Sequence, residues 1–188
     1  MTGKERAAYL FLSLLQARTG SSYTSRLGDL SPLEFMNLNP DQIAGRVKMT
    51  ERATGIFAAL KAGFDPERLE RELEAKGARG VTLADKDYPE PLVDIPDPPP
   101  ALFVAGRIPE GPAVALVGSR KASPTGLDSA RELGRALGER GVCVISGLAL
   151  GIDAAAHEGV LAGGGTTVGV LGSGIDVANA PTDKPRAT

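Results

Sequence analysis

Ala113-Val-Ala-Leu-Val-Gly-Ser-Arg120 is the first of three apolar runs that end in small residues. The others are Val142-Cys-Val-Ile-Ser-Gly147 and Val168-Gly-Val-Leu-Gly-Ser-Gly174. Their apolar parts do not alternate with polar residues, a pattern typical of parallel strands that are buried on both faces. We therefore expect strands at 114–117, 142–145 and 168–171.

Helical patterns separate these strands. Ser123 and Pro124 start one helix, which ends before Gly141 and whose apolar stripe comprises Leu127, Ala130, Leu133 and Leu137. A shorter helix is expected at about 153–161, with Asp153 as its N-cap. Strand–helix–strand units cross over in the right-handed sense, so the pattern predicts an α/β fold with a doubly wound parallel sheet.

Residues 1–80 are predicted to form a small all-helical domain. Ser31 with Glu34, and Asn39 with Gln42, have the spacing of capping boxes, and each is followed by a proline at the first helical position. A third helix is expected to start at Asp65-Pro66, and Gly77 suits its left-handed C-cap.

Residues 81–112 contain eight prolines around one apolar run at 101–105. Because proline cannot donate a hydrogen bond to a central strand, this composition predicts a rigid linker with one edge strand. The chain is thus divided into a helical domain at 1–80, a Pro-rich linker at 81–112, a partial α/β domain at 113–177 and a polar tail at 178–188.

Composition excludes several classes of site. Five Phe, three Tyr and no Trp are too few for a nucleic-acid platform of stacked rings, and a single Cys143 and a single His157 cannot build a disulfide framework or a zinc site. We expect no metal, no cofactor and a reducing, cytoplasmic setting. Neither a signal peptide nor a membrane span is expected. Residues 1–80 hold 12 Lys and Arg against 10 Asp and Glu, and residues 81–188 hold 9 against 13, so nucleic acid would have to bind a local patch.

Small residues follow all three predicted strands: Gly118-Ser119-Arg120, Ser146-Gly147 and Gly172-Ser173-Gly174. Parallel strands bring such turns to one carboxyl edge, where open α/β sheets bind ligands and where glycine lets backbone N–H groups approach an anion. Arg120 is the best candidate for a bidentate phosphate contact, and Lys121 is a looser one. The sequence predicts an anion site at this edge.

Enzymatic alternatives have weaker support. No G-x-G-x-x-G or Gly-Lys-Ser/Thr loop follows a strand, which disfavours a standard dinucleotide or NTP site. Ser146, Asp153 and His157 have the residue types of a hydrolytic triad, but Ser146 lacks the G-x-S-x-G elbow. We expect no catalytic residue, and we expect His157 to be a packing or phosphate-side residue.

Longer strings carry a family resemblance. Ala115-Leu-Val-Gly-Ser-Arg120, Val144-Ile-Ser-Gly-Leu-Ala-Leu-Gly-Ile-Asp153 and Gly169-Val-Leu-Gly-Ser-Gly-Ile-Asp176 resemble the DNA processing protein A family, also called DprA or Smf. The resemblance covers about residues 81–177 and implies a Rossmann-like fold. The helical N-terminus is similar in general character to that family's sterile-alpha-motif-like domain.

The resemblance implies a cytoplasmic, non-enzymatic protein that binds incoming single-stranded DNA in natural transformation, protects it and helps to load a RecA-type recombinase. The family's sequence continues into further strands and a dimer surface, whereas this chain departs from it after Asp176. We therefore expect a shortened member with an incomplete sheet, and a homodimer stays an open alternative. The residues expected to contact DNA are Gly118, Ser119, Arg120, Lys121, Ser146, Gly147, Gly151, His157, Gly172, Ser173 and Gly174.

Two competing interpretations stay open. One is a small-nucleotide-binding or phosphoribohydrolase-like enzyme of the same superfamily, although Gly163-Gly-Gly-Thr166-Thr167 is followed by Val168 with no nearby carboxylate. The other is an inactive truncated remnant.

Overall fold

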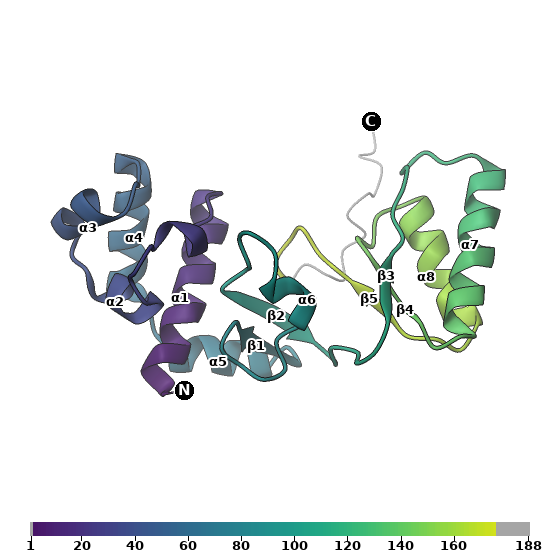
Figure 1. Ribbon diagram of the computed structural model, residues 1–188, viewed down its shortest axis with the longest axis horizontal. Coiled ribbons are helices and arrows are strands. Elements are labelled where there is room, and N and C mark those ends of the chain that lie inside the picture. Colours follow the sequence, from purple (N-terminus) through teal and green to yellow (C-terminus); the bar gives the residue numbers. More distant parts are fainter. Residues whose placement is uncertain (1, 176–188) are drawn as a thin grey trace. The chain divides into compact units, whose positions relative to one another are not determined.

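The computed structural model describes residues 2–175 of the 188 (Figure 1). The chain divides into two compact units between Gly106 and Arg107. The predicted tail at 178–188 and residues 176–177 of the predicted α/β domain lie outside the described residues.

The first unit contains the helices of the N-terminal part. They are α1 (Gly3–Thr19), the short 3-10 helix η1 (Thr24–Arg26), α2 (Pro32–Asn37), α3 (Pro40–Arg46), α4 (Glu51–Gly63) and α5 (Pro66–Glu74). The capping boxes predicted at Ser31 and Asn39 are both formed. A third box, in which Thr2 accepts from the Glu5 amide and Glu5 accepts from the Thr2 amide, starts α1. Sequence analysis did not identify α1, and this box is the signal that could have found it.

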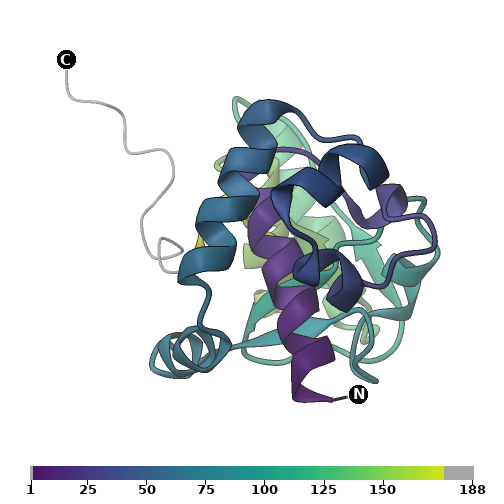
Figure 2. The same cartoon turned by 90° about the vertical axis from the view of Figure 1, so that its left-hand side faces the viewer.

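Aromatic side chains on α1, α2 and α4 form the centre of the first core. Figure 2 shows α1 flanked by α4 and by the short helices α2 and α3. Phe11 of α1 and Phe35 of α2 both pack edge-on against Phe57 of α4, with ring centroids 5.3 and 5.2 Å apart. All three rings are fully buried, so this cluster joins helices whose short lengths would leave them unstable alone.

A two-stranded antiparallel sheet completes the first unit. β1 (Ala78–Thr82) pairs with β2 (Ala101–Ala105), the strand predicted at 101–105, and a loop carrying α6 (Glu90–Val93) connects them. This sheet packs on α1, so residues 81–106 are part of the folded first unit rather than a separate linker. The prolines of this segment lie mostly in the connecting loop, where their missing N–H breaks no strand pairing.

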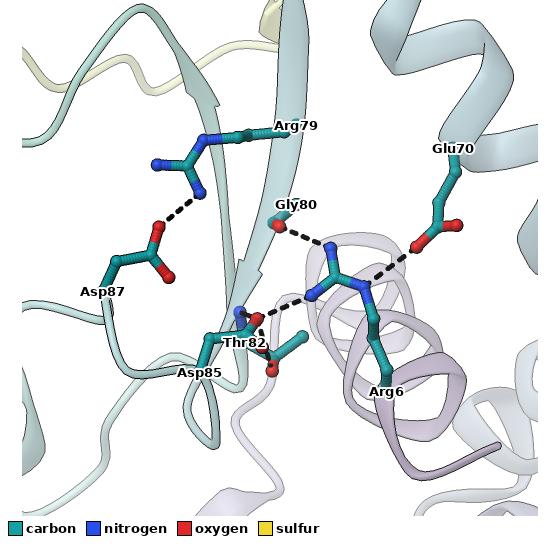
Figure 3. Close-up of polar contacts among 7 residues, drawn as sticks. All are labelled: Arg6, Glu70, Arg79, Gly80, Thr82, Asp85 and Asp87. Carbon is teal, nitrogen blue, oxygen red and sulfur yellow. Dashed lines mark hydrogen bonds and ion pairs between the residues drawn. The ribbon is translucent and has the colours of Figure 1, made fainter. Parts of the chain in front are cut away.

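One arginine ties the sheet to the helices (Figure 3). The Arg6 guanidinium on α1 donates to Glu70 of α5 at 2.9 Å, to Asp85 at 2.6 Å and to the Gly80 carbonyl of β1 at 2.7 Å. Asp85 also accepts from the backbone N–H and the hydroxyl of Thr82. Arg6 thus joins α1, α5, β1 and the loop after β1.

The second unit is an α/β fold, as the sequence predicts. β3 (Ala113–Ala115), β4 (Cys143–Ser146) and β5 (Thr167–Gly169) form a parallel sheet in the order β3-β4-β5. The connecting helices α7 (Pro124–Gly138) and α8 (Ile152–Ala162) lie together beside one face of the sheet (Figure 1). Val144, Ala156 and Val160 form its buried core.

The expectation that every strand is buried on both faces is wrong for β3 and β5. The three residues of β3 are exposed, with Val114 at 40% and the following Val117 at 67%, and no residue of β5 is buried. Among residues 107–175, β3 is an edge strand that pairs only with β4. Its unbroken apolar sequence therefore does not correspond to burial in this part of the chain.

Glycines set the contact between α7 and α8. A Cβ on Gly134 would lie 2.5 Å from the Ala156 carbonyl oxygen, and a Cβ on Gly159 would lie 2.1 Å from the Arg131 carbonyl oxygen. The face of α7 toward α8 therefore runs through Gly134 and Gly138, and Leu133, predicted on the buried stripe, is 52% exposed.

Candidate functional site at the carboxyl edge of the sheet

The turns after β3 and β4 meet at one carboxylate. Asp153, in the first turn of α8, accepts from the Gly118 amide through Oδ1 at 3.2 Å and from the Gly147 amide through Oδ2 at 3.0 Å. Its side chain is buried. The structure thus brings the first two predicted turns together, and Asp153 is the residue that joins them.

The role expected for Asp153 was wrong. The N-cap of α8 is Gly151, which makes no side-chain capping bond, and Asp153 lies inside the helix with its carboxylate turned to the strand ends. A carboxylate in the first turn is favoured by the helix dipole, and here it satisfies two loop amides rather than an amide of its own helix.

Glycine is required where the turns approach α8. A Cβ on Gly118 would lie 2.7 Å from the Ile152 side chain, and one on Gly147 would lie 2.9 Å from Asp153 Oδ2. Gly151 has a φ of +86°, and its Cβ would lie 2.3 Å from the Ser119 carbonyl oxygen. All three glycines were predicted site residues, and they let the turns after β3 and β4 lie close against the start of α8.

The outer part of the first turn carries the exposed cations. The Ile152 amide donates to the Ser119 carbonyl at 3.1 Å, and the Ser119 hydroxyl accepts from the Lys121 amide at 3.1 Å. Ser119, Arg120 and Lys121 are all exposed, and Ser123 then caps α7 by accepting from the Gly126 amide. Two cationic residues therefore lie in the turn that leads to the N-terminal end of α7, whose partial positive charge adds to theirs.

The third turn lies beside the second. The Val170 amide donates to the Ser146 carbonyl at 2.8 Å, and the exposed residues Gly172, Ser173 and Gly174 follow. Leu148, with a left-handed φ of 55°, places its side chain over Gly169, where a Cβ would lie only 2.2 Å from Leu148 Cδ1.

The residues of the considered triad do not form a catalytic arrangement. The Ser146 hydroxyl donates to the Leu116 carbonyl at 2.6 Å, and Asp153 accepts from the two glycine amides. His157 Nδ1 lies 2.6 Å from the Thr167 hydroxyl, which itself donates to the Val144 carbonyl, so Nδ1 carries the proton. Each group makes a bond within the fold.

His157 is a buried, neutral side chain. Burial disfavours the imidazolium and lowers the pKa of His157, while the negative charge of Asp153 works in the opposite direction. Its Nε2 atom is buried and has no hydrogen-bond partner among the described residues. His157 therefore packs between α8 and β5 and lies away from the exposed turns.

The glycine run of the competing phosphoribohydrolase-like interpretation lies at the opposite edge of the sheet. Gly163 ends α8, Gly164 has a left-handed φ of +71°, and a Cβ on Gly165 would lie 2.4 Å from the Gly138 Cα. These residues lead into the amino end of β5. Their sequence is explained by the close packing of α8 against α7.

Within residues 2–175 there is no group of three or more His, Cys, Asp or Glu side chains that could hold a metal ion. In the same range, no helix combines the length and the apolar character that crossing a membrane requires.

Comparison with known proteins gives a consistent result. The family model of DNA recombination-mediator protein A matches residues 79–187. The match begins two residues before the segment 81–177 that carries the resemblance and extends ten residues past it, beyond Asp176, where the chain was expected to depart from the family. Protein Smf of Synechocystis sp. is 35% identical over 143 residues, covering 73% of this chain and 35% of that protein. DNA processing protein DprA of Streptococcus pneumoniae is 42% identical over 128 residues, covering 67% of this chain and 44% of that protein.

The X-ray structure of the Streptococcus pneumoniae DprA is also similar, with a TM-score of 0.60 and 26% sequence identity. The match covers 96% of this chain and 60% of that one. The chain therefore spans less than half the length of both curated relatives described above.

Proposed function

Because the chain belongs to the DNA recombination-mediator protein A family, we propose that it binds single-stranded DNA and acts in DNA recombination during natural transformation. Exposed Arg120 and Lys121 at the carboxyl end of β3 carry this proposal. A guanidinium and an ammonium next to the N-terminus of α7 suit the phosphates of a nucleic-acid backbone. We call residues 119–121 together with 172–174 the rim.

The geometry favours a single strand over a duplex. The rim consists of two short turns at one edge of a three-stranded sheet. We expect a flexible single strand to adapt its backbone to both turns, whereas a duplex is stiff, with a persistence length of about 150 base pairs. Contacts to phosphate alone also leave the bases unread, which suits DNA of any sequence.

The wider role follows from the family. We propose that bound DNA is protected and passed to a RecA-type recombinase, that the chain has no catalytic activity of its own, and that it works in the cytoplasm. The intramolecular bonds of Ser146, Asp153 and His157 support a non-enzymatic role. Homodimerisation is a further proposal that light scattering on the purified chain tests.

Arg120→Ala tests the proposed DNA contact. We expect it to weaken binding of a single-stranded oligonucleotide by about 1–3 kcal/mol and to reduce the salt dependence by about one phosphate contact. Fluorescence anisotropy at several salt concentrations, with single-stranded and duplex DNA of one sequence, measures both effects.

Arg140→Ala is the matched control. Arg140 is exposed and lies in the turn that leads into the amino end of β4, the opposite edge of the sheet. Its replacement by alanine should leave the affinity for single-stranded DNA unchanged. Equal losses in the two variants, or tighter binding of duplex than of single strand by the unchanged protein, would contradict the proposal.

A further inference from the structure

The two glycine amides held by Asp153 converge as anion-binding amides do. Gly118 follows β3, Gly147 follows β4, and their N–H groups point to one carboxylate at 3.2 and 3.0 Å. At this position in open α/β sheets, converging backbone amides and a helix N-terminus bind phosphate. In this chain the position holds a carboxylate that belongs to the protein itself.

We propose that Asp153 is an internal anion that fills this amide nest and excludes free phosphate and nucleotide phosphates from it. The residue Asp153 is only 6% exposed, and the space beside Gly147 is so small that a single Cβ there would lie 2.9 Å from Oδ2. A phosphate could enter only by displacing Asp153, and a dianion beside the remaining carboxylate would be repelled.

The filled nest determines which ligand the site can hold, an inference that rests on the proposed function. Asp153 occupies the Gly118 and Gly147 amides. DNA phosphates can then contact only the exposed rim, residues 119–121 and 172–174. Each such contact is solvent-exposed and weak, so affinity needs several phosphates on one strand. A mononucleotide offers one phosphate group and should not compete with a DNA strand.

Removing the carboxylate should convert the nest into an anion site. In Asp153→Ala, two amides lose their acceptor and a small space opens between them. We expect this variant to unfold at a lower temperature than the unchanged protein and to regain several degrees in phosphate or acetate, compared with chloride at equal ionic strength. The gain should saturate with anion concentration, and the unchanged protein should show no saturable gain.

Ser146→Ala is the control for destabilisation alone. It removes the 2.6 Å bond to the Leu116 carbonyl in the same sheet and leaves Asp153 in place. The midpoint of its thermal unfolding should fall, and phosphate or acetate should not specifically raise it again. An anion response in Asp153→Ala no larger than that of Ser146→Ala would overturn the inference.

Two further arms do not depend on how well Asp153→Ala folds. Asp153→Asn fills the same space but offers one carbonyl oxygen in place of two carboxylate oxygens, so it hinders entry of an anion while leaving one amide without an acceptor. Its anion response should be smaller than that of Asp153→Ala, and an equal response would place the anion elsewhere and refute the inference. In the unchanged protein, the NMR signals of the Gly118 and Gly147 amides should not move when inorganic phosphate is added, and a saturable shift would show an open nest.

Binding of single-stranded DNA by the unchanged protein is measured separately. Loss of that binding would remove the proposed function and leave the anion result standing. Displacement of bound DNA by a deoxynucleoside monophosphate would contradict the filled nest while leaving DNA binding intact.

Discussion

Arg6 donates three hydrogen bonds, more than a single ion pair would need. Its three donor bonds go to two carboxylates and one backbone carbonyl on different elements, and its side chain is only 28% exposed. Partial burial works to raise the pKa of Asp85, but hydrogen bonds from Thr82 and the charge of Arg6 outweigh it and hold that pKa below its ordinary value. Asp85 therefore stays ionised and keeps the arginine in place.

Arg6→Lys should destabilise the first unit although it keeps the positive charge. An ammonium cannot direct donors to Glu70, Asp85 and the Gly80 carbonyl in the planar arrangement of a guanidinium, and we expect a loss of about 1–3 kcal/mol in urea unfolding. Arg68→Lys is the control, since its pair with Glu72 is an exposed i,i+4 contact. That change should cost less than about 0.5 kcal/mol. Similar losses in both variants would show that the Arg6 geometry is unimportant.

His157 should make the second unit less stable in mild acid. Its pKa in the folded protein lies below the ordinary value of about 6.5, so the unfolded chain takes up a proton first as the pH falls. Stability is complete above pH 6.5 and falls from there down to the folded-state pKa, by at most about 1.4 kcal/mol per pH unit. Urea titrations at pH 7.5 and 5.5, followed at the Val144 NMR signal, measure the change. His157→Gln should remove this change in stability between the two pH values. If the free energy of unfolding of that variant fell by the same amount, the effect would belong to other groups.

At the level of the elements, glycine fixes the distance between α7 and α8. Gly159→Ala would put a methyl carbon 2.1 Å from the Arg131 carbonyl oxygen, a backbone atom that cannot turn aside. The helices would have to separate, and we expect the second unit to lose about 1–3 kcal/mol despite the better helix propensity of alanine.

Gly126→Ala, in the first turn of α7, is the matched control. Its Cβ would meet nothing closer than Ser123 Oγ at 3.4 Å. Helix propensity should then stabilise the unit by up to about 1 kcal/mol. If Gly159→Ala were equally tolerated in thermal unfolding, the close contact between the helices would be disproved.

Local signals explain which elements could be predicted. Capping at Ser31 and Asn39, the left-handed Gly77 and the strands after Ala113 depend on neighbours within a few residues, and all of them are present in the structure. Asp153 bonds to an amide 35 residues away. A carboxylate near a helix start equally suits an N-cap, so its sequence position could not distinguish the two roles. The sequence predicts that the three turns lie together. It does not predict which of their backbone amides donate to a side chain of the protein itself.

The whole molecule is made of two units, and the segment between them contains no helix or strand. Residues 107–112 are exposed or half-buried, and Gly106 and Gly111 both have left-handed φ angles. We expect trypsin to cleave first after Arg107 among the described residues and to release an N-terminal fragment that keeps its fold. Mass spectrometry of a short digest identifies the site. A first cut at Lys86, in the loop between β1 and β2, would instead show that this loop opens more readily than the junction.

The packing of α1 on the sheet also sets an order of events on the ribosome. Gly80 packs on Leu10, and Ser13 donates to the Ala101 carbonyl, 88 residues further along the chain. At ~5–20 residues per second, that carbonyl is synthesised roughly 4–18 s after Ser13. The aromatic cluster of α1, α2 and α4 can assemble in the meantime, while the strip of the nascent α1 that β1 and β2 will cover stays open to chaperones. The last strand of the first unit ends at Ala105, so this unit can close before β5 of the second unit, Thr167–Gly169, has left the ribosome.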